Sequence, residues 1–207
     1  MLTNRNSKLG KSIWAFNLPA GVTCPGASEA CSAMCYAKKT ERIYSNARLA
    51  YAANLEQVQG SKDWTDDVIG QIKAKRIATV RIHAKGDFYS AEYILEWIDI
   101  AAACPDTIFF AYTRSWRVAG LLPALEALKA LKNVRLLASV DWTTGPAPDG
   151  WRAARMMDKA ESKAIKAGAR PAVAGIVCLE QAGKAESCGD CKVCFKPGKG
   201  TVNFILH

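Results

Sequence analysis

The residues of this 207-residue chain whose types and spacing could do chemistry are its eight cysteines. Seven of them form two groups, with the spacings C-x6-C-x3-C and C-x9-C-x2-C-x2-C. No apolar signal segment follows Met1, so we expect the chain to stay in the cytoplasm. There, cysteines more often bind metals or act in catalysis than form disulfides. The N-terminal cysteine group is Cys24, Cys31 and Cys35, and the C-terminal cysteine group is Cys178, Cys188, Cys191 and Cys194.

The spacing of the C-terminal cysteine group favours an iron–sulfur cluster over zinc. Structural zinc sites combine two ligand pairs, whereas the two histidines of this chain, His83 and His207, lie far apart. The last three cysteines, at x2-x2 spacing, are typical of three corners of a [4Fe–4S] cluster whose fourth ligand comes from elsewhere. Cys178 is the nearest candidate for that ligand. Zinc and unliganded thiols remain the alternatives.

The N-terminal cysteine group offers three ligands and no obvious fourth. A [4Fe–4S] cluster held at three corners leaves one iron open to a small molecule, as an enzyme requires. The alternative is a purely structural site completed by His83 or by a cysteine of the other group. Cys104 ends a helical stretch, and we expect it to be a small buried apolar residue.

Positive charge is concentrated at the two cysteine-rich ends of the chain. The net charge is +9; residues 1–50 carry seven basic and two acidic side chains, and residues 152–207 carry ten and five, so each end has +5. This pattern favours contact with nucleic acid through its phosphates, or cations placed around anionic metal–thiolate centres or another anionic substrate. No apolar run approaches the ~20 residues that cross a bilayer, so we expect no membrane contact.

The order of apolar segments predicts an α/β fold with a parallel sheet, because strands alternate with helices. We expect a partial (β/α) barrel of about five to six parallel strands over residues 1–178. Residues 179–207 are expected to form a cysteine-rich metal-binding tail that packs on the same domain and folds around its metal. The expected strands are 12–16, 77–83, 107–112, 134–140 and 171–178, and the expected helices are 42–59, one capped at Thr65, 91–103, 120–131 and 152–167.

Polar residues follow each predicted strand. In parallel sheets, ligands bind beyond the carboxyl ends of the strands, so these residues should meet at one edge. The N-terminal cysteine group follows the first strand and Cys178 follows the last. We expect His83, Asp87 and Arg114 to take part in catalysis, and Gly86, Asp87, Ser139 and Asp141 to bind a cofactor.

Each of these residues also has a purely structural alternative. His83 fits a hydrogen-bonded, half-buried histidine, and Gly86-Asp87 fits a turn before a helix cap at Ser90. Arg114 could pair with a surface acid, and Asp141 could cap the loop that follows it.

With these residues laid out, the chain resembles the radical-SAM enzymes over residues 12–194. In that family, three cysteines after the first strand hold a [4Fe–4S] cluster whose open iron binds the amino and carboxylate groups of S-adenosylmethionine. The resemblance gives that role to the N-terminal cysteine group. Gly86-Asp87-Phe88 matches the segment that contacts the methionine amino group, and Ser139-Val140-Asp141 resembles the polar end of the fourth strand. The usual cysteine loop of the family is C-x3-C-x2-C, from which this sequence departs.

The resemblance implies an iron–sulfur enzyme with two [4Fe–4S] clusters, the second held by the C-terminal cysteine group as an auxiliary cluster. It also implies radical chemistry started from S-adenosylmethionine or another small ligand, and an electron donor such as flavodoxin or ferredoxin. The alternative is a nucleic-acid-binding protein with structural or redox-sensing iron–sulfur or zinc centres, favoured by the basic helix expected over 152–167. The segments Thr-Cys-Pro-Gly-Ala and Gly-Asp-Phe-Tyr-Ser also resemble a group of phage and plasmid proteins.

Overall fold

The computed structural model describes residues 1–206, which fold around one seven-stranded sheet. The strand order is β1-β2-β3-β4-β5-β7-β6, every neighbouring pair is parallel, and the sheet is not closed. The predicted α/β class with a parallel sheet is therefore confirmed. The strands are β1 (Trp14–Phe16), β2 (Thr79–Ile82), β3 (Ile108–Thr113), β4 (Val134–Val140), β5 (Arg152–Met156), β6 (Gly175–Val177) and β7 (Thr201–Phe204).

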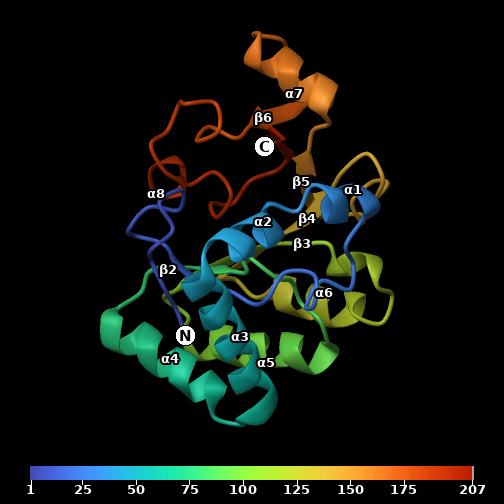
Figure 1. The fold of residues 1–207 in the computed structure, drawn as a ribbon. Coiled ribbons are helices and arrows are strands. Elements are labelled where there is room, and N and C mark those ends of the chain that lie inside the picture. The colour runs from blue at the N-terminus through green and yellow to red at the C-terminus, as the bar shows by residue number, and fades with distance from the viewer. Residues whose placement is uncertain (207) are drawn as a thin grey trace.

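Helices connect the strands, and most of them gather on one side of the sheet (Figure 1). The longest are α3 (Ser45–Gly60), α4 (Trp64–Lys75) and α5 (Ala91–Ala103). The others are α1 (Glu29–Ala33), α2 (Tyr36–Ile43), the short 3-10 helix η1 (Ser115–Arg117), α6 (Leu122–Ala130), α7 (Lys159–Lys166) and α8 (Cys188–Cys191).

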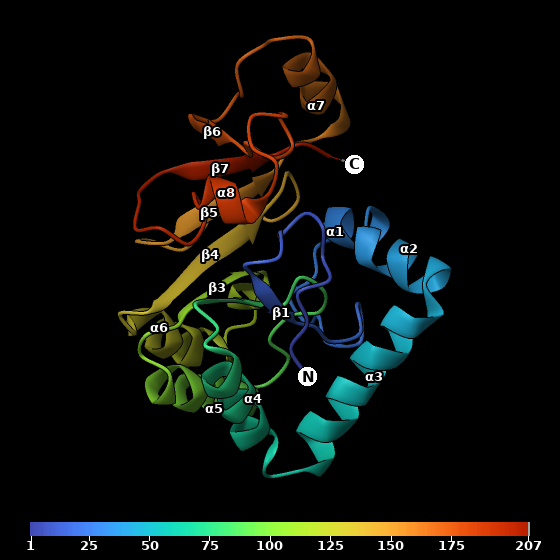
Figure 2. The same ribbon diagram turned by 90° about the vertical axis from the view of Figure 1, so that its left-hand side faces the viewer.

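The two faces of the sheet are covered by different parts of the chain. On the helix face, strand residues such as Val80 and Phe109 pack with Trp97 of α5 and Leu125 of α6 in the main core. On the opposite face, Phe110 packs with Phe195 of the cysteine-rich tail, their ring centroids 5.1 Å apart. The helix layer and the tail lie on opposite sides of β3 and β4 in Figure 2.

The strand order explains why the tail lies on the second face. From β1 to β5 each new strand is added on the same side, so right-handed crossovers place their connections on one face. The chain then passes over the position of β7 to form β6 and turns back to insert β7 between β5 and β6. A right-handed connection in this reversed direction must cross the opposite face, so residues 178–200 cover that face.

Three sequence expectations about elements were wrong. Residues 152–156 are strand β5 and not the start of a basic helix, because pairing with β4 and β7 on both sides outweighs the helix-favouring alanines. The helix expected over 42–59 is two helices, which meet at Tyr44 in an extended conformation. Helix α4 begins at Trp64 with Asp63 at its N-cap position, so Thr65 is not the cap.

The tail also contributes more to the fold than expected. Its last residues form β7, which pairs with β5 and β6 and raises the number of strands to seven. Val202 of β7 is buried with Leu137 and Ala154 on the tail side of the sheet. The tail therefore belongs to the central sheet as well as carrying cysteines.

Candidate functional site

The loop that carries the N-terminal cysteine group is fastened to the end of β2. The amide of Asp87 donates a hydrogen bond to the carbonyl of Thr23 (3.1 Å), and the amide of Leu18 donates to the carbonyl of Lys85 (3.1 Å). Gly86 lies between them with φ +80°, and a Cβ atom there would come within 2.8 Å of both Thr23 Oγ1 and Leu18 Cβ. The close approach of the cysteine loop to β2 therefore requires glycine at position 86.

The same loop is fastened to the ends of β3 and β4. Gly26 lies against the backbone carbonyl of Arg114, where no side chain fits. Ser28 caps α1 by accepting a hydrogen bond from the amide of Cys31 (3.0 Å). Its hydroxyl donates to Oδ2 of Asp141 (2.5 Å), directly after β4. Three neighbouring strands thus hold the cysteine loop over their carboxyl ends, as predicted from their order in the sequence.

The three thiols of the N-terminal cysteine group are free, half-buried and within electrostatic reach of one another. Burial raises the pKa of Cys24 to about 11. The hydrogen bond from the Gly21 amide opposes this rise, and negative charge on Asp87, Cys31 and Cys35 adds to it. Burial likewise raises the pKa of Cys31, and the nearby guanidinium of Arg114 acts in the opposite direction. Without a bound cation, Cys24 and Cys31 are protonated at neutral pH.

Arg114 is the cation that lies beside Cys31, and Asp87 and Asp141 hold it in place. Asp87 accepts a hydrogen bond from the Arg114 amide at Oδ2 (2.8 Å), and its Oδ1 accepts from the amide of Phe88 (2.8 Å). Asp141 Oδ2 accepts from Nη2 (3.0 Å) and Nε (3.3 Å) of the Arg114 side chain. Nη1 of Arg114 has no hydrogen-bond partner within residues 1–206 and remains able to bind a ligand.

The two carboxyl groups experience different environments. Burial raises the pKa of Asp87 above its ordinary value, although Thr113 and the amides of Arg114 and Phe88 donate hydrogen bonds that lower it. Burial also acts to raise the pKa of Asp141. There the hydrogen bonds from Ser28 and Thr143 and the charge of Arg114 prevail, so the pKa is lowered. Both carboxyl groups are saturated with donors, which suits them to position Arg114.

His83 lies away from this edge, in the aromatic core on the helix face. Its side chain is buried, Nε2 lies 2.7 Å from the hydroxyl of Tyr93, and its ring packs edge-on against Phe88 with 4.8 Å between centroids. Burial lowers the pKa of His83 to about 3, so the ring stays neutral. This placement favours a structural role, although His83 is fully buried and not half-buried, and its Nδ1 has no hydrogen-bond partner within residues 1–206. The catalytic role of His83 stays a prediction.

Ser139 and Lys85 complete this edge. The carbonyl of Ser139 accepts a hydrogen bond from Nε1 of Trp116 (3.3 Å). The ammonium of Lys85 lies 4.1 Å from the ring centroid of Tyr36 and donates to Oγ1 of Thr40 (3.2 Å). Burial lowers the pKa of Lys85 to about 8, while Glu41 and Cys35 act to raise it. Lys85 follows β2 at this edge, but we assigned it no role from the sequence.

The C-terminal cysteine group lies on the tail face of the sheet, apart from the N-terminal cysteine group. Helix α8 is fastened to the N-terminal segment, because the amide of Cys188 donates to the carbonyl of Lys8 (2.9 Å). Cys178 directly follows β6, and its thiol lies within electrostatic reach of Cys188 and Cys194. Burial raises the pKa of all three thiols, that of Cys188 to about 11. Cys191 lies three residues after Cys188 on α8, where side chains are neighbours.

Arg81 and Tyr112 form the floor beneath the C-terminal cysteine group. The Arg81 guanidinium lies 4.1 Å from the ring centroid of Tyr112. Its positive charge partly opposes the rise in pKa that burial causes at Cys188 and Cys194. The side chains of Tyr112 and Cys194 are hydrogen-bonded to each other. Arg81 was not selected from the sequence. The signal is a charged residue in the middle of an otherwise buried parallel strand, where apolar residues are the rule.

Two features are absent from residues 1–206. No group of three or more His, Cys, Asp or Glu side chains there is arranged to hold a single metal ion. No helix in that part of the chain has the length and apolar character needed to cross a membrane.

Comparison with known proteins identifies a phage family. The family described as gene product 88 matches residues 1–197. The gene 88 protein of Mycobacterium phage D29 is 30% identical over 157 residues, and that of Mycobacterium phage L5 is 29% identical over 157 residues. In both cases the match covers 70% of this chain and 61% of the relative, so the chain spans less than two thirds of these relatives' length. No solved structure matches. The expected link to phage proteins is confirmed: the chain belongs to the gene product 88 family.

Proposed function

We propose that this protein is an iron–sulfur enzyme in which the N-terminal cysteine group holds a cluster with one open coordination position. The observation that carries the proposal is the attachment of the cysteine loop to the ends of β2, β3 and β4. This attachment brings three thiols to the same edge as Arg114, whose backbone amide is bound by Asp87 and whose guanidinium is bound by Asp141. The thiols that would hold the cluster and the guanidinium that would bind an anionic ligand therefore lie side by side.

The donor set fits an iron–sulfur cluster in its chemistry. Iron–sulfur clusters are bound by cysteine thiolates, and both cysteine groups consist of free thiols within electrostatic reach of one another. Cationic side chains stand beside each group, Arg114 near Cys31 and Arg81 near Cys188, where they would stabilise anionic thiolates. A cluster of several irons spaces its ligands more widely than a single ion does, so the lack of a single-ion site in residues 1–206 is compatible with this proposal.

In this proposal the chain's own residues bind and orient a small chelating ligand such as S-adenosylmethionine. Arg114 binds the carboxylate of that ligand, since a guanidinium forms paired hydrogen bonds with a carboxylate. Asp87 and Asp141 keep Arg114 in the required orientation. Gly86 allows the loop to approach β2, and Ser139 lies on the neighbouring strand. The predicted catalytic role of His83 is left out of the proposal because its ring lies in the aromatic core.

When bound, the cluster would supply the electron that cleaves a sulfonium ligand and starts radical chemistry. The protein would supply orientation and exclusion of water. The C-terminal cysteine group would hold the auxiliary cluster, with Arg81 and Tyr112 beneath it. An external donor such as flavodoxin or ferredoxin would deliver the electrons.

Electron paramagnetic resonance of the anaerobically purified, dithionite-reduced protein tests this proposal. We expect a cluster signal that changes when S-adenosylmethionine is added, together with release of the adenosyl fragment. The change should disappear in Arg114→Gln and persist in Arg135→Gln. Arg135 is a suitable control because its guanidinium bonds to carbonyls at the opposite end of β4. A signal that never responds to the ligand in the wild-type protein would contradict the open position.

A second candidate function is nucleic-acid binding with structural or redox-sensing iron–sulfur or zinc centres. It is favoured by the exposed basic side chains of α7, which are Lys159, Lys163 and Lys166. Strongly salt-dependent binding to DNA or RNA without any response to S-adenosylmethionine would favour this candidate over the enzyme. A colourless preparation with stoichiometric zinc would identify the zinc form.

A further inference from the structure

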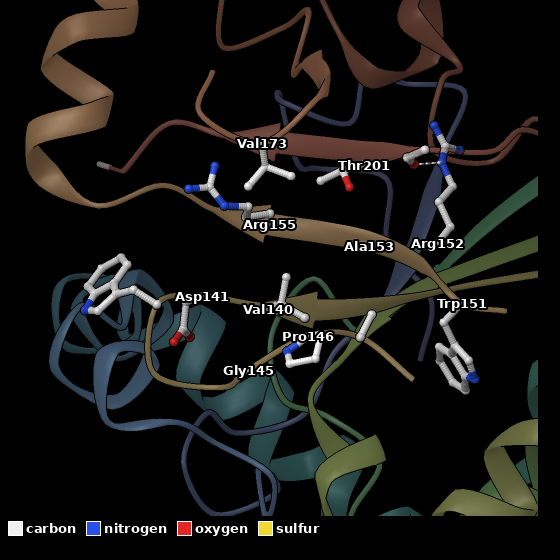
Figure 3. A pocket seen from close by; sticks show the side chains of 13 residues that line it. Val140, Asp141, Gly145, Pro146, Trp151, Arg152, Ala153, Arg155, Val173 and Thr201 are labelled. Carbon is white, nitrogen blue, oxygen red and sulfur yellow. Dashed lines mark hydrogen bonds between the residues drawn. The ribbon is translucent and has the colours of Figure 1, made fainter. Parts of the chain in front are cut away.

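A groove of about 470 Å³ lies along the helix face of β5, beside the end of β4 (Figure 3). Its origin is the connection from β4 to β5: residues 141–151 form a loop, whereas the connections before it carry helices that cover the sheet. One wall is this loop, with Pro146 and Ala147, and the other includes Val173. Ala153 of β5 and Thr201 of β7 also line the groove.

An exposed tryptophan lines the groove. Trp142 follows Asp141 directly, and 49% of its surface is exposed. Trp151, by contrast, is buried and donates from Nε1 to Glu126, so its polar atom is already used. A large exposed aromatic ring at a groove is a platform on which a planar ring can stack.

Positive charge borders the same groove. Arg152 donates hydrogen bonds only to carbonyl oxygens, those of Gly200 (3.0 Å) and Val193 (2.8 Å), so no carboxylate within residues 1–206 neutralises it. Lys199 is exposed and precedes Gly200, which lines the groove. Arg155 also lines the groove, but Glu161 pairs with it. The negative charge of Asp141 is likewise compensated, by Arg114.

The groove adjoins the N-terminal cysteine group. Asp141 lines the groove and accepts the hydrogen bond from Ser28, whose hydroxyl also caps the helix that carries Cys31. A molecule bound beside Trp142 would therefore lie close to the proposed open coordination position.

We propose that this groove binds single-stranded nucleic acid, with one base stacked on Trp142 and the phosphates near Arg152 and Lys199. A stacking platform and uncompensated cations spread along a groove of this size fit a short stretch of a strand, in which the phosphates near Arg152 and Lys199 belong to neighbours of the base on Trp142. In a duplex the bases are paired and stacked on one another, so none is free to stack on Trp142. The idea that the strand is a substrate rests on the proposed enzymatic function. The idea that the groove binds the strand does not depend on that function.

Fluorescence anisotropy of a labelled single-stranded oligonucleotide of about twelve nucleotides, titrated with the full chain, tests this inference. Trp142→Ala should weaken binding about tenfold or more, and Trp142→Phe should restore most of it, because base–aromatic stacking is worth about 1–3 kcal/mol. Leu95→Ala is the matched control: its side chain is 52% exposed on α5, away from the groove. Lys199→Gln should reduce the salt dependence of binding, with a slope smaller by about one.

Several outcomes would overturn the inference. They are no binding at low salt, equal binding by Trp142→Ala and wild type, and equal affinity for duplex. If a free mononucleotide competes as effectively as the unlabelled oligonucleotide, the ligand of the groove is a single nucleotide and not a strand, and the inference is wrong. The titration is repeated with Cys31→Ala and compared with the iron content of each sample. If the Cys31→Ala variant loses iron but still binds the strand, binding by the groove does not depend on the cluster. The proposed enzyme activity can then be wrong while the proposed binding site is right.

Discussion

Replacement of Asp141 by asparagine should loosen the attachment of the N-terminal cysteine loop to the sheet. The side chain of Asp141 is fully buried and accepts hydrogen bonds from Ser28 and Arg114 at Oδ2 and from Thr143 at Oδ1. Asparagine keeps the shape but loses the charge, and its amide nitrogen must face one of these donors. Breaking a buried ion pair costs about 3–5 kcal/mol, and asparagine retains some of the hydrogen bonds. We therefore expect the free energy of unfolding to fall by about 3 kcal/mol.

For a chain of this length, such a loss corresponds to a Tm lower by about 6–12 °C. Denaturant unfolding followed by tryptophan fluorescence measures the change, and hydrogen exchange at the Cys31 amide shows whether the loop is released. Asp149→Asn is the control, because Asp149 is exposed in the same connection. A loss below about 1 kcal/mol, or one equal to that of the control, would refute the anchoring role of Asp141.

The effect of this substitution should also depend on pH. The folded-state pKa of Asp141 lies below its ordinary value of 3.8. A lowered pKa contributes stability above the unfolded-state pKa, and this contribution is lost as pH falls through the folded-state pKa. The difference between wild type and Asp141→Asn should therefore be constant near neutral pH and shrink below about pH 4. A difference that grows on acidification would contradict the assignment of an ionised carboxylate.

Two further predictions concern Gly86 and Arg81. Gly86→Ala should cost about 2–5 kcal/mol of unfolding free energy, because strain at positive φ adds to contact with Thr23 and Leu18. Gly145→Ala, which also has positive φ (+76°) but open space around it, should cost only about 1–2 kcal/mol, and equal losses in the two variants would contradict the close approach. Arg81→Gln should lower the reduction potential of a cluster at the C-terminal cysteine group, because it removes a nearby positive charge. Arg81→Lys should restore the potential in a spectroelectrochemical titration; unchanged potentials in both variants would remove Arg81 from this role.

Local patterns in the sequence were sufficient for the parallel sheet and for the edge at which the N-terminal cysteine group meets Arg114 and Asp141. They did not place His83 in the aromatic core or Cys178 on the tail face, where the structure has them. The apolar runs that form β3 and β4 read as buried strands, and parallel order then placed the N-terminal cysteine group and Asp141 at one edge. Strand β5 was missed because Arg-Ala-Ala-Arg-Met resembles a helix in composition, and only its two neighbouring strands make it extended.

Contacts between distant segments could not be predicted in the same way. Ser28 and Asp141 are 113 residues apart, and nothing in the local pattern of either links them. The placement of the tail on the second face depends on the position of β7 between β5 and β6, and a four-residue strand at the end of the chain gives little signal. The proximity of Arg81 to the C-terminal cysteine group depends on this placement of the tail, so it could not be predicted from the sequence around Arg81.

Iron and sulfide content after anaerobic purification tests the central claim most directly. Two [4Fe–4S] clusters predict about eight irons and eight sulfides per chain. Replacement of Cys24, Cys31 and Cys35 by alanine should leave about four irons, and so should replacement of the C-terminal cysteine group. Stoichiometric zinc without iron in the wild-type protein would contradict the account. So would an iron content that does not change when the N-terminal cysteine group is removed.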